Sequence, residues 1–228
     1  MIISFEGIDG SGKSTQVKIL SERIEARGKT VHRVREPGGT SVSERIRSIL
    51  LDVELDIDPF AEMLLFSAAR AQLVRTKLKE LNQEGEIIIC DRFYDSTIAY
   101  QGGGRQIAEV DWLDQFQQTV TSGLVPDRTY LIRVSAENAA SRQTGRTADR
   151  MEQLDSTFFQ RVVKAYDDLA EKHSDRFCVI DGDQSIDAIA DEISSDLSTL
   201  KAFLDVWVEF GSNLAKSTAG TRNSSAGR

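Results

Sequence analysis

The chain opens with a short apolar segment that leads directly into a glycine-rich loop. The loop runs from Gly7 to Thr15 and matches the pattern G-x-x-x-x-G-K-[ST] in full. Met1–Phe5 has the composition of a buried strand, and residues 16–27 have the pattern of a helix. Glycines let the backbone aim several N–H groups at phosphate oxygens, and the helix adds the positive end of its dipole. The pattern therefore predicts a nucleoside triphosphate site. A glycine-rich turn without a ligand is the alternative.

Every residue of the loop is a candidate for phosphate binding. These residues are Gly7, Ile8, Asp9, Gly10, Ser11, Gly12, Lys13, Ser14 and Thr15. Lys13 can reach the β- and γ-phosphates, and the Ser14 hydroxyl can ligate Mg²⁺. A second apolar run, residues 86–90, ends in Asp91 and Arg92. We expect Asp91 to hold a water of the Mg²⁺ shell and Arg92 to reach a phosphate between donor and acceptor. A strand that simply ends in polar residues is the alternative.

Composition narrows the class of protein. The chain has 228 residues, is 40% hydrophobic and carries a formal net charge of −8. An acidic chain is a poor match for nucleic acid, which needs a basic face, so we expect no nucleic-acid partner. The two cysteines lack metal-ligand spacing, and we see neither a signal segment nor a membrane span. A cytoplasmic protein without a membrane partner is the expectation.

Apolar runs alternate with helical patterns along the chain. The expected strands are Met1–Phe5, Thr30–Arg35, Glu86–Asp91, Arg128–Val134 and Arg176–Asp181. The expected helices are Lys13–Arg27, Ser41–Leu51, Pro59–Glu84, Val110–Ser122, Ala136–Arg142, Ser156–His173 and Ile186–Asp196. This alternation predicts an α/β protein with a five-stranded parallel sheet and helices on both faces, the P-loop NTPase fold. Residues 1–200 are expected to form one domain. Residues 201–228 form a C-terminal extension whose polar end we expect to be disordered.

Two basic segments accompany the glycine-rich loop. Arg35-Glu36-Pro37-Gly38-Gly39-Thr40 follows the second expected strand and precedes a helix that carries Arg47. Arg47 can bind an acceptor phosphate, although an ordinary turn before a solvated helix gives the same pattern. The segment of about residues 142–153 contains Arg142, Arg146 and Arg150. It is a candidate lid that closes over the triphosphate; a solvated charged loop is the alternative.

A base-binding pair is suggested by helical spacing. Phe66 and Arg70 lie four residues apart and so share one helix face, and Thr97 and Gln101 have the same spacing. An aromatic ring and an arginine can stack on a nucleobase and hydrogen-bond it. A phenylalanine that simply belongs to the core is the alternative.

Taken together, these segments resemble the thymidylate kinases of the bacterial kind, from Met1 to about Asp196. The resemblance rests on FEGIDGSGKST at residues 5–15, REPGGT at 35–40, LFSAAR at 65–70, DRFYDSTIAYQG at 91–102 and DRME at 149–152. It implies transfer of the γ-phosphoryl group of ATP to dTMP, with Mg²⁺, in a homodimeric enzyme.

The resemblance also implies individual roles. Phe66 would stack on thymine, and Arg70, Thr97 and Gln101 would hydrogen-bond its edge. Arg47 and Arg92 would hold the acceptor phosphate, in a cluster oriented by Glu36 beside Pro37. Asp9 and Tyr100 would lie near the deoxyribose, and Arg142 would stack on adenine opposite Gly182-Asp183-Gln184. The implied catalytic set is Lys13, Arg92, Arg146, Arg150 and Asp9.

Two details place the chain within that family. Some members carry an arginine in the glycine-rich loop, whereas residues 8–11 here are Ile, Asp, Gly and Ser. The basic residues lie instead in the lid, as in many bacterial members. Phe93 follows Asp91-Arg92 where Tyr or His is usual, so any role for that side chain is in doubt.

Three other functions fit part of the pattern. A kinase of the same fold that acts on another nucleotide or a deoxynucleoside shares most of these motifs. A GTP-dependent switch would read guanine with Asn-Lys-x-Asp, and the chain has no such tetrapeptide. A non-catalytic ATP-binding protein would not need elements for donor, acceptor and lid together.

Overall fold

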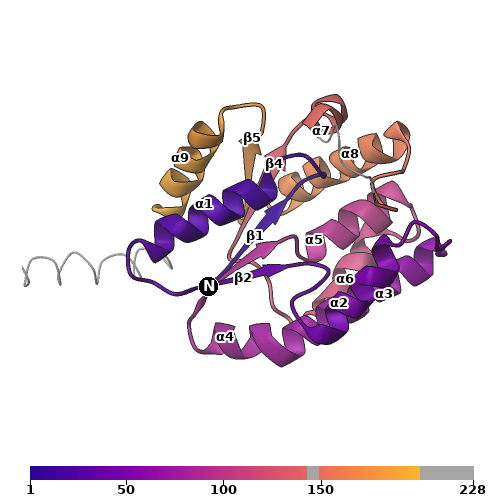
Figure 1. The fold of residues 1–228 in the computed structure, drawn as a ribbon, viewed down its shortest axis with the longest axis horizontal. Coiled ribbons are helices and arrows are strands. Elements are labelled where there is room, and N and C mark those ends of the chain that lie inside the picture. Colours follow the sequence, from indigo (N-terminus) through magenta and orange to yellow (C-terminus); the bar gives the residue numbers. More distant parts are fainter. Residues whose placement is uncertain (143–148, 201–228) are drawn as a thin grey trace, which may run out of the picture.

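The computed structural model describes residues 1–142 and 149–200. Within them, five strands form one parallel sheet: β1 (Ile2–Glu6), β2 (Val31–Arg35), β3 (Ile87–Asp91), β4 (Arg128–Arg133) and β5 (Phe177–Asp181). The strand order is β2-β3-β1-β4-β5, with β1 at the centre (Figure 1). Because all strands are parallel, their carboxyl ends meet at one edge of the sheet, and ligands in such folds bind beyond that edge. This confirms the predicted fold class.

Helices cover both faces of the sheet (Figure 1). On one face lie α1 (Lys13–Glu25) and α9 (Ile186–Leu197), whose apolar residues share a core cluster with β1 and β4. Residues of α3 (Pro59–Leu73), α6 (Val110–Val120) and α8 (Ser156–Lys172) belong to a second cluster, on the opposite face. The remaining α-helices are α2 (Ser41–Leu51), α4 (Lys79–Gln83), α5 (Tyr94–Thr97) and α7 (Ala136–Arg142).

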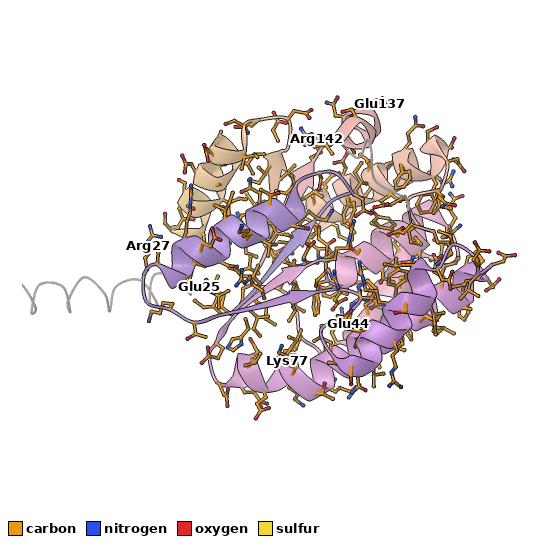
Figure 2. All side chains as sticks on the ribbon, in the orientation of Figure 1. Glu25, Arg27, Glu44, Lys77, Glu137 and Arg142 are labelled. Atoms are coloured by element: carbon orange, nitrogen blue, oxygen red, sulfur yellow. The ribbon has the colours of Figure 1, made fainter. Side chains whose placement is uncertain are left out.

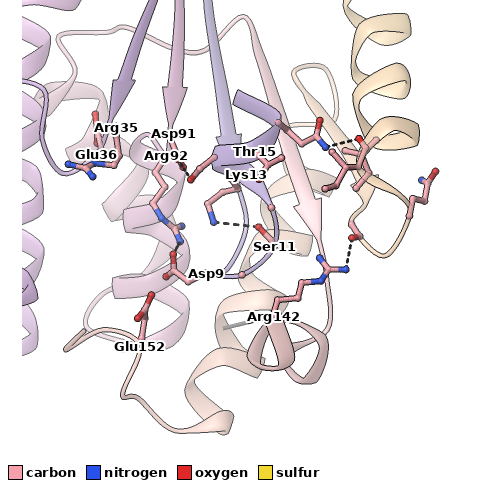
Figure 3. Close-up of a pocket in the computed structure, with 18 of the residues that line it drawn as sticks. Asp9, Ser11, Lys13, Thr15, Arg35, Glu36, Asp91, Arg92, Arg142 and Glu152 are labelled. Atoms are coloured by element: carbon pink, nitrogen blue, oxygen red, sulfur yellow. Dashed lines mark hydrogen bonds and ion pairs between the residues drawn. The ribbon is translucent and has the colours of Figure 1, made fainter. Parts of the chain in front are cut away.

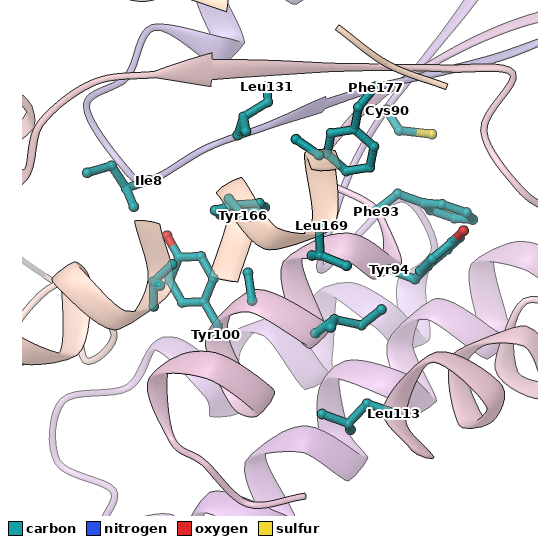
Figure 4. Close-up of a cluster of buried hydrophobic side chains, with 14 of the residues drawn as sticks. Ile8, Cys90, Phe93, Tyr94, Tyr100, Leu113, Leu131, Tyr166, Leu169 and Phe177 are labelled. Atoms are coloured by element: carbon teal, nitrogen blue, oxygen red, sulfur yellow. The ribbon is translucent and has the colours of Figure 1, made fainter. Parts of the chain in front are cut away.

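The strands alternate their side chains between these two cores. Ile2 and Ile88 belong to the larger cluster, whereas Ile3 and Ile89 belong to the other, and all four are buried. Such alternation explains why the strands read as continuous apolar runs, since both faces of the sheet are covered. Figure 4 shows the larger cluster, where Phe93 and Leu169 pack with Phe177. Charged side chains such as Arg27 and Glu137 point outward (Figure 2).

Two helical regions differ from the sequence prediction. The expected helix Pro59–Glu84 is divided into α3, a π-helical segment η1 (Val74–Leu78) and α4. A second helical stretch, α5 followed by the π-helical segment η2 (Ile98–Gly104), is absent from the predicted helices. Three glycines end that stretch, and they favour loop over helix in a sequence reading. A Cβ at Gly103 would lie 2.3 Å from the Ala165 Cβ, so close packing on α8 accounts for that glycine.

Candidate functional site

The glycine-rich loop joins β1 to α1 at the carboxyl edge of the sheet. Gly12 caps α1 with a φ of 98°, a left-handed conformation that favours glycine. At Gly7 a Cβ would lie 2.5 Å from the Ile132 carbonyl oxygen, so only glycine fits against β4. Lys13 Nζ lies inside the loop and donates to the Ile8 carbonyl at 2.8 Å. Burial first, and then the charge of Arg92, lower the pKa of Lys13 to about 8.

A polar cavity of about 1080 Å³ lies over this loop (Figure 3). Loop residues 9–16 line it together with residues from four other segments of the chain. These are Arg35, Glu36, Arg47, Asp91, Arg92, Arg142, Asp149, Glu152, Gly182, Gln184, Ser185, Ile186 and Ile189. The cavity thus brings together the predicted triphosphate loop, the Asp91–Arg92 strand end and the predicted adenine loop, on a scale that accommodates a nucleotide.

Ser14 and Asp91 form a pair of oxygen ligands at this cavity. The Ser14 hydroxyl donates to Asp91 Oδ2 at 2.5 Å. A hydroxyl and a carboxylate suit Mg²⁺, which usually takes one or two protein ligands and completes its shell with waters and phosphates. Over residues 1–142 and 149–200, no three His, Cys, Asp or Glu side chains gather in a way that would hold a metal ion by themselves. The residues therefore fit a cation that is shared with a bound triphosphate.

Arg92 lines the cavity over the glycine-rich loop and bonds to residues of that loop and of η2. Its backbone has a φ of 71°, a conformation that is uncommon for a residue with a side chain. The guanidinium donates to Asp9 Oδ1 at 2.8 Å, to the Gly7 carbonyl at 2.8 Å and to the Tyr100 hydroxyl at 3.1 Å. This geometry directs the side chain back over the glycine-rich loop, where it can meet a phosphate between donor and acceptor.

Glu6 holds the backbone next to Arg92, and sequence reasoning missed it. Its carboxylate is fully buried and accepts from the Phe93 N–H at 2.7 Å, the Ser96 hydroxyl at 2.6 Å and the Tyr166 hydroxyl at 2.8 Å. Burial, and then the charge of Asp95, raise the pKa of Glu6 from 4.5 to about 7, against the opposing effect of Arg92. The sequence feature that could have revealed Glu6 is an acidic residue at the end of an apolar strand.

The Phe93 side chain contributes a ring, whose centroid lies 5.9 Å from Cζ of the Arg70 guanidinium. It is fully buried in the larger core cluster, and only its backbone N–H and carbonyl bond to Glu6 and Arg70. The unusual residue at this position therefore adds packing rather than a polar group to the site.

Arg35 and Arg47 add positive charge on the side of the cavity away from α9. Arg47 Nη1 donates to the Pro37 carbonyl at 3.1 Å, after a cis Glu36–Pro37 peptide bond. Burial, and then the charge of Arg35, lower the pKa of Arg47. Two guanidiniums that face one cavity in this way favour binding of an anion.

A second, smaller cavity of about 80 Å³ adjoins the first. Its lining includes the predicted base-binding residues Phe66, Arg70, Thr97 and Gln101, along with Tyr100. Arg70 is fixed by several bonds: Nε to Glu36 Oε2 at 2.6 Å, Nη1 to the Thr97 hydroxyl at 2.9 Å and to Gln117 Oε1 at 2.7 Å, and Nη2 to the Phe93 carbonyl at 3.1 Å. Glu36 thus orients Arg70, a predicted base-binding residue. The sequence predicted that Glu36 orients the phosphate cluster, and Glu36 also lines the larger cavity with Arg47 and Arg92.

Two arginines of the predicted lid, Arg142 and Arg150, differ in where the structure places them. Arg142 donates to the Gly182 carbonyl at 3.0 Å and to Asp183 at 3.2 Å, which brings it to the predicted adenine loop. Arg150 Nη2 pairs with Glu62 at 2.7 Å, and its Nε donates to the Leu50 carbonyl at 2.8 Å. Arg150 is therefore anchored to α2 and α3 rather than placed over the glycine-rich loop. Arg146 lies outside the described residues.

Comparison with known proteins gives one consistent result. The family model for thymidylate kinase matches residues 5–193. Thymidylate kinase of Thermosipho africanus is 44% identical over 195 residues, covering 86% of this chain and 96% of that protein. Thymidylate kinase of Bifidobacterium longum is 42% identical over 204 residues, covering 88% and 98%. The crystal structure of thymidylate kinase from Ehrlichia chaffeensis is similar with a TM-score of 0.72 and 34% identity, over 87% of this chain and 98% of that one.

The raised pKa of Glu6 predicts a pH-dependent stability. Between pH 4.5 and about 7 the native state holds a proton on Glu6 that the unfolded state has released. The free energy of unfolding of the wild type should therefore fall relative to Glu6→Gln as pH rises through this window, by about 3 kcal/mol. Urea denaturation of both proteins at several pH values measures the difference. A difference that stays constant from pH 4.5 to pH 8 would contradict this account.

Proposed function

Since the chain belongs to the thymidylate kinase family, we propose that it transfers the γ-phosphoryl group of ATP to dTMP, with Mg²⁺, to give dTDP. The observation that carries this proposal is the junction of the two cavities. Asp9, Glu36, Arg47 and Arg92 line both of them. The donor triphosphate would lie on the glycine-rich loop, and the acceptor nucleotide would place its base in the smaller cavity. The phosphates of donor and acceptor would then meet at this shared wall.

The smaller cavity offers groups that suit thymine. Phe66 presents a ring beside it, and Arg70 and Thr97 supply N–H and O–H donors at its buried end. We propose that Phe66 stacks on the base and that Arg70, Thr97 and Gln101 bind its polar edge. Asp9 and Tyr100, which also line this cavity, would contact the deoxyribose, while Arg47 and Arg92 bind the acceptor phosphate.

Phosphoryl transfer needs alignment and positive charge more than covalent help from the protein. Lys13 supplies that charge from the glycine-rich loop, and Arg92, the residue after β3, supplies it at the shared wall. Ser14 and Asp91 would hold Mg²⁺, which neutralises charge on the β- and γ-phosphates when bound. The acceptor phosphate oxygen is already anionic, so Asp9 would organise sugar and arginine rather than remove a proton.

The substrate assignment predicts a clear order among acceptors. With ATP and Mg²⁺, a coupled ADP-release assay over a panel of nucleoside monophosphates should give the highest kcat/KM with dTMP, followed by dUMP. Omission of Mg²⁺ should abolish turnover. A preference for a purine or cytosine monophosphate would reject the substrate, and ATP binding without turnover of any monophosphate would reject the enzyme.

The lid residues give a second prediction. The glycine-rich loop has no arginine, so we propose that a lid arginine supplies charge to the transferring group, with Arg146 first and Arg150 as the alternative. Arg146→Ala should lower kcat on the order of 10³-fold. The contacts of Arg150 with Glu62 and Leu50 favour a positioning role for it. Steady-state kinetics of both single variants decide, and near-normal kcat in both would contradict a lid arginine.

We further propose that the protein is a homodimer that pairs through the outer surface of α2, α3 and α6. Ile49, Phe60, Leu64 and Trp112 are exposed there by 44–46% although they are large and apolar. Such residues in one region are typical of an interface. Leu64→Glu should give a monomer in sedimentation equilibrium, whereas Val179→Glu on β5, at a similarly exposed apolar residue, should leave the dimer intact. A monomeric wild type would contradict the proposal.

Two points of organisation complete the proposal. None of the helices within the described part of the chain has the length and apolar character needed to cross a membrane. We propose that residues 1–200 form one kinase domain, with a lid at about 142–153, and that the protein is cytoplasmic. Residues 201–228, expected to form an extension, lie outside the described residues. Limited proteolysis and cell fractionation test these two proposals.

A further inference from the structure

Glu62 on α3 is a buried carboxylate behind the smaller cavity. It is fully buried and accepts hydrogen bonds from three side chains. Gln101 Nε2 donates to Oε1 at 3.0 Å, Arg105 donates to both oxygens at 3.2 and 2.9 Å, and Arg150 pairs with Oε2 at 2.7 Å. Burying a carboxylate is costly unless its oxygens are fully bonded, so three donors, two from η2 and its C-cap and one from residue 150, make this a built arrangement.

The contact with Gln101 has a consequence for the cavity. A glutamine amide has a donor end and an acceptor end, and rotation of the amide exchanges them. An ionised carboxylate only accepts, so it stabilises the orientation in which Nε2 faces Glu62. Gln101 lines the smaller cavity, and its Oε1 has no hydrogen bond to any residue that the structure describes. The acceptor end is therefore the one left for a ligand.

The donors across the cavity are fixed in the same way. Thr97 Oγ1 accepts from Arg70 Nη1, which leaves the Thr97 hydroxyl proton free to donate. Arg70 can only donate, because a guanidinium has no acceptor. The cavity therefore presents donors from Arg70 and Thr97 beside an acceptor from Gln101. Thymine and uracil show the complementary order, an O4 acceptor beside an N3–H donor, and cytosine shows the reverse at both positions.

We propose that Glu62 is a positioning residue for base selection, which fixes the Gln101 amide so that the site takes bases with an N3–H and rejects cytosine. The inference rests on the proposed function for the location of the base. Glu62 acts on the base through Gln101. Glu62 also pairs with Arg150, which lies in the segment before α8, so this segment contacts the same carboxylate as Gln101.

The size of the effect follows from hydrogen-bond pairing in a buried site. In cytosine, the N3 acceptor would face the fixed acceptor of Gln101, and the N4 amino donor would face the fixed donors of Arg70 and Thr97. Polar groups of both the base and the protein would then stay unpaired, and such mismatches reduce kcat/KM strongly. If the Gln101 amide is free to rotate, one of the two mismatches with cytosine is removed. The loss of selectivity should therefore be large, although Lys13 and Arg92 keep their contacts.

The experiment compares Glu62→Gln with the wild type on dTMP and dCMP. Glutamine at position 62 can accept or donate, so either orientation of Gln101 becomes possible. We expect the ratio of kcat/KM for dTMP over dCMP to fall on the order of 10-fold or more, with KM for dTMP raised and kcat for dTMP within a few-fold of wild type. Calorimetric titration with both nucleotides should show the same loss of preference in binding.

Asp196→Asn is the matched control. Asp196 also receives a two-pronged contact from an arginine, Arg128, but it joins β4 to α9 away from either cavity. This variant should lower stability and leave the base preference unchanged. If Glu62→Gln does not fold, Glu62→Met/Arg105→Met/Arg150→Met removes the carboxylate together with both arginines that pair with it, a change that proteins often tolerate, and the same loss of preference in calorimetric binding is expected.

The outcomes separate this inference from the proposed function. A folded Glu62 variant that keeps the wild-type preference for dTMP over dCMP overturns the positioning role. A variant with equal losses for both nucleotides, mainly in kcat, also overturns it, since that is the effect of a structural residue. A wild type that binds neither nucleotide overturns the proposed substrate and, with it, the location of the base on which the inference rests.

Discussion

The site depends on the contact between the Arg92 guanidinium and Asp9. One group follows β3 and the other belongs to the glycine-rich loop after β1, and their bond of 2.8 Å crosses the carboxyl edge of the sheet. The two strands are neighbours in a parallel sheet, so their ends come together without any long connection. Because Arg92 and Asp9 line both cavities, this pair forms the wall at which a donor and an acceptor would meet. The left-handed backbone at Arg92 directs the side chain to that wall.

Buried carboxylates hold the arrangement in place. Glu6 bonds to the backbone after Arg92, Glu36 bonds to Arg70, and Glu62 bonds to Gln101. Each of the three lies within a few per cent of full burial and bonds to a residue that lines the smaller cavity, which is Ser96 in the case of Glu6. Burial raises the pKa of Glu6 and of Glu36, so these groups weaken the fold at neutral pH while they fix the geometry of the site. A cost in stability that serves pre-organisation is typical of functional sites.

The sequence predicted those parts of the site that are local in the chain. The glycine-rich loop, Asp91–Arg92 and the spacing of Phe66 and Arg70 can be read from a few consecutive residues, because strand ends and helix periods fix their geometry. Glu6, Glu62 and Gln117 were missed since their roles depend on partners 39 or more residues away. The helical stretch of Tyr94–Gly104 was missed for a similar reason: packing on α6 and α8, and not local preference, accounts for its glycines. Long-range contacts of this kind leave no periodic signal in one sequence.

The division of labour among the arginines follows from these contacts. An arginine that selects a base must be held still, and Arg70, for which we propose that role, is held by four partners that are themselves buried. An arginine that acts during transfer needs room to approach the phosphates, and the bonds of Arg150 to Glu62 and Leu50 hold it away from the glycine-rich loop. The same segment, residues 149–152, also places Asp149 at both cavities. Glu62 bonds both to Gln101, which we propose to bind the base, and to Arg150, at one end of the proposed lid, so these two parts of the proposed site share one buried carboxylate.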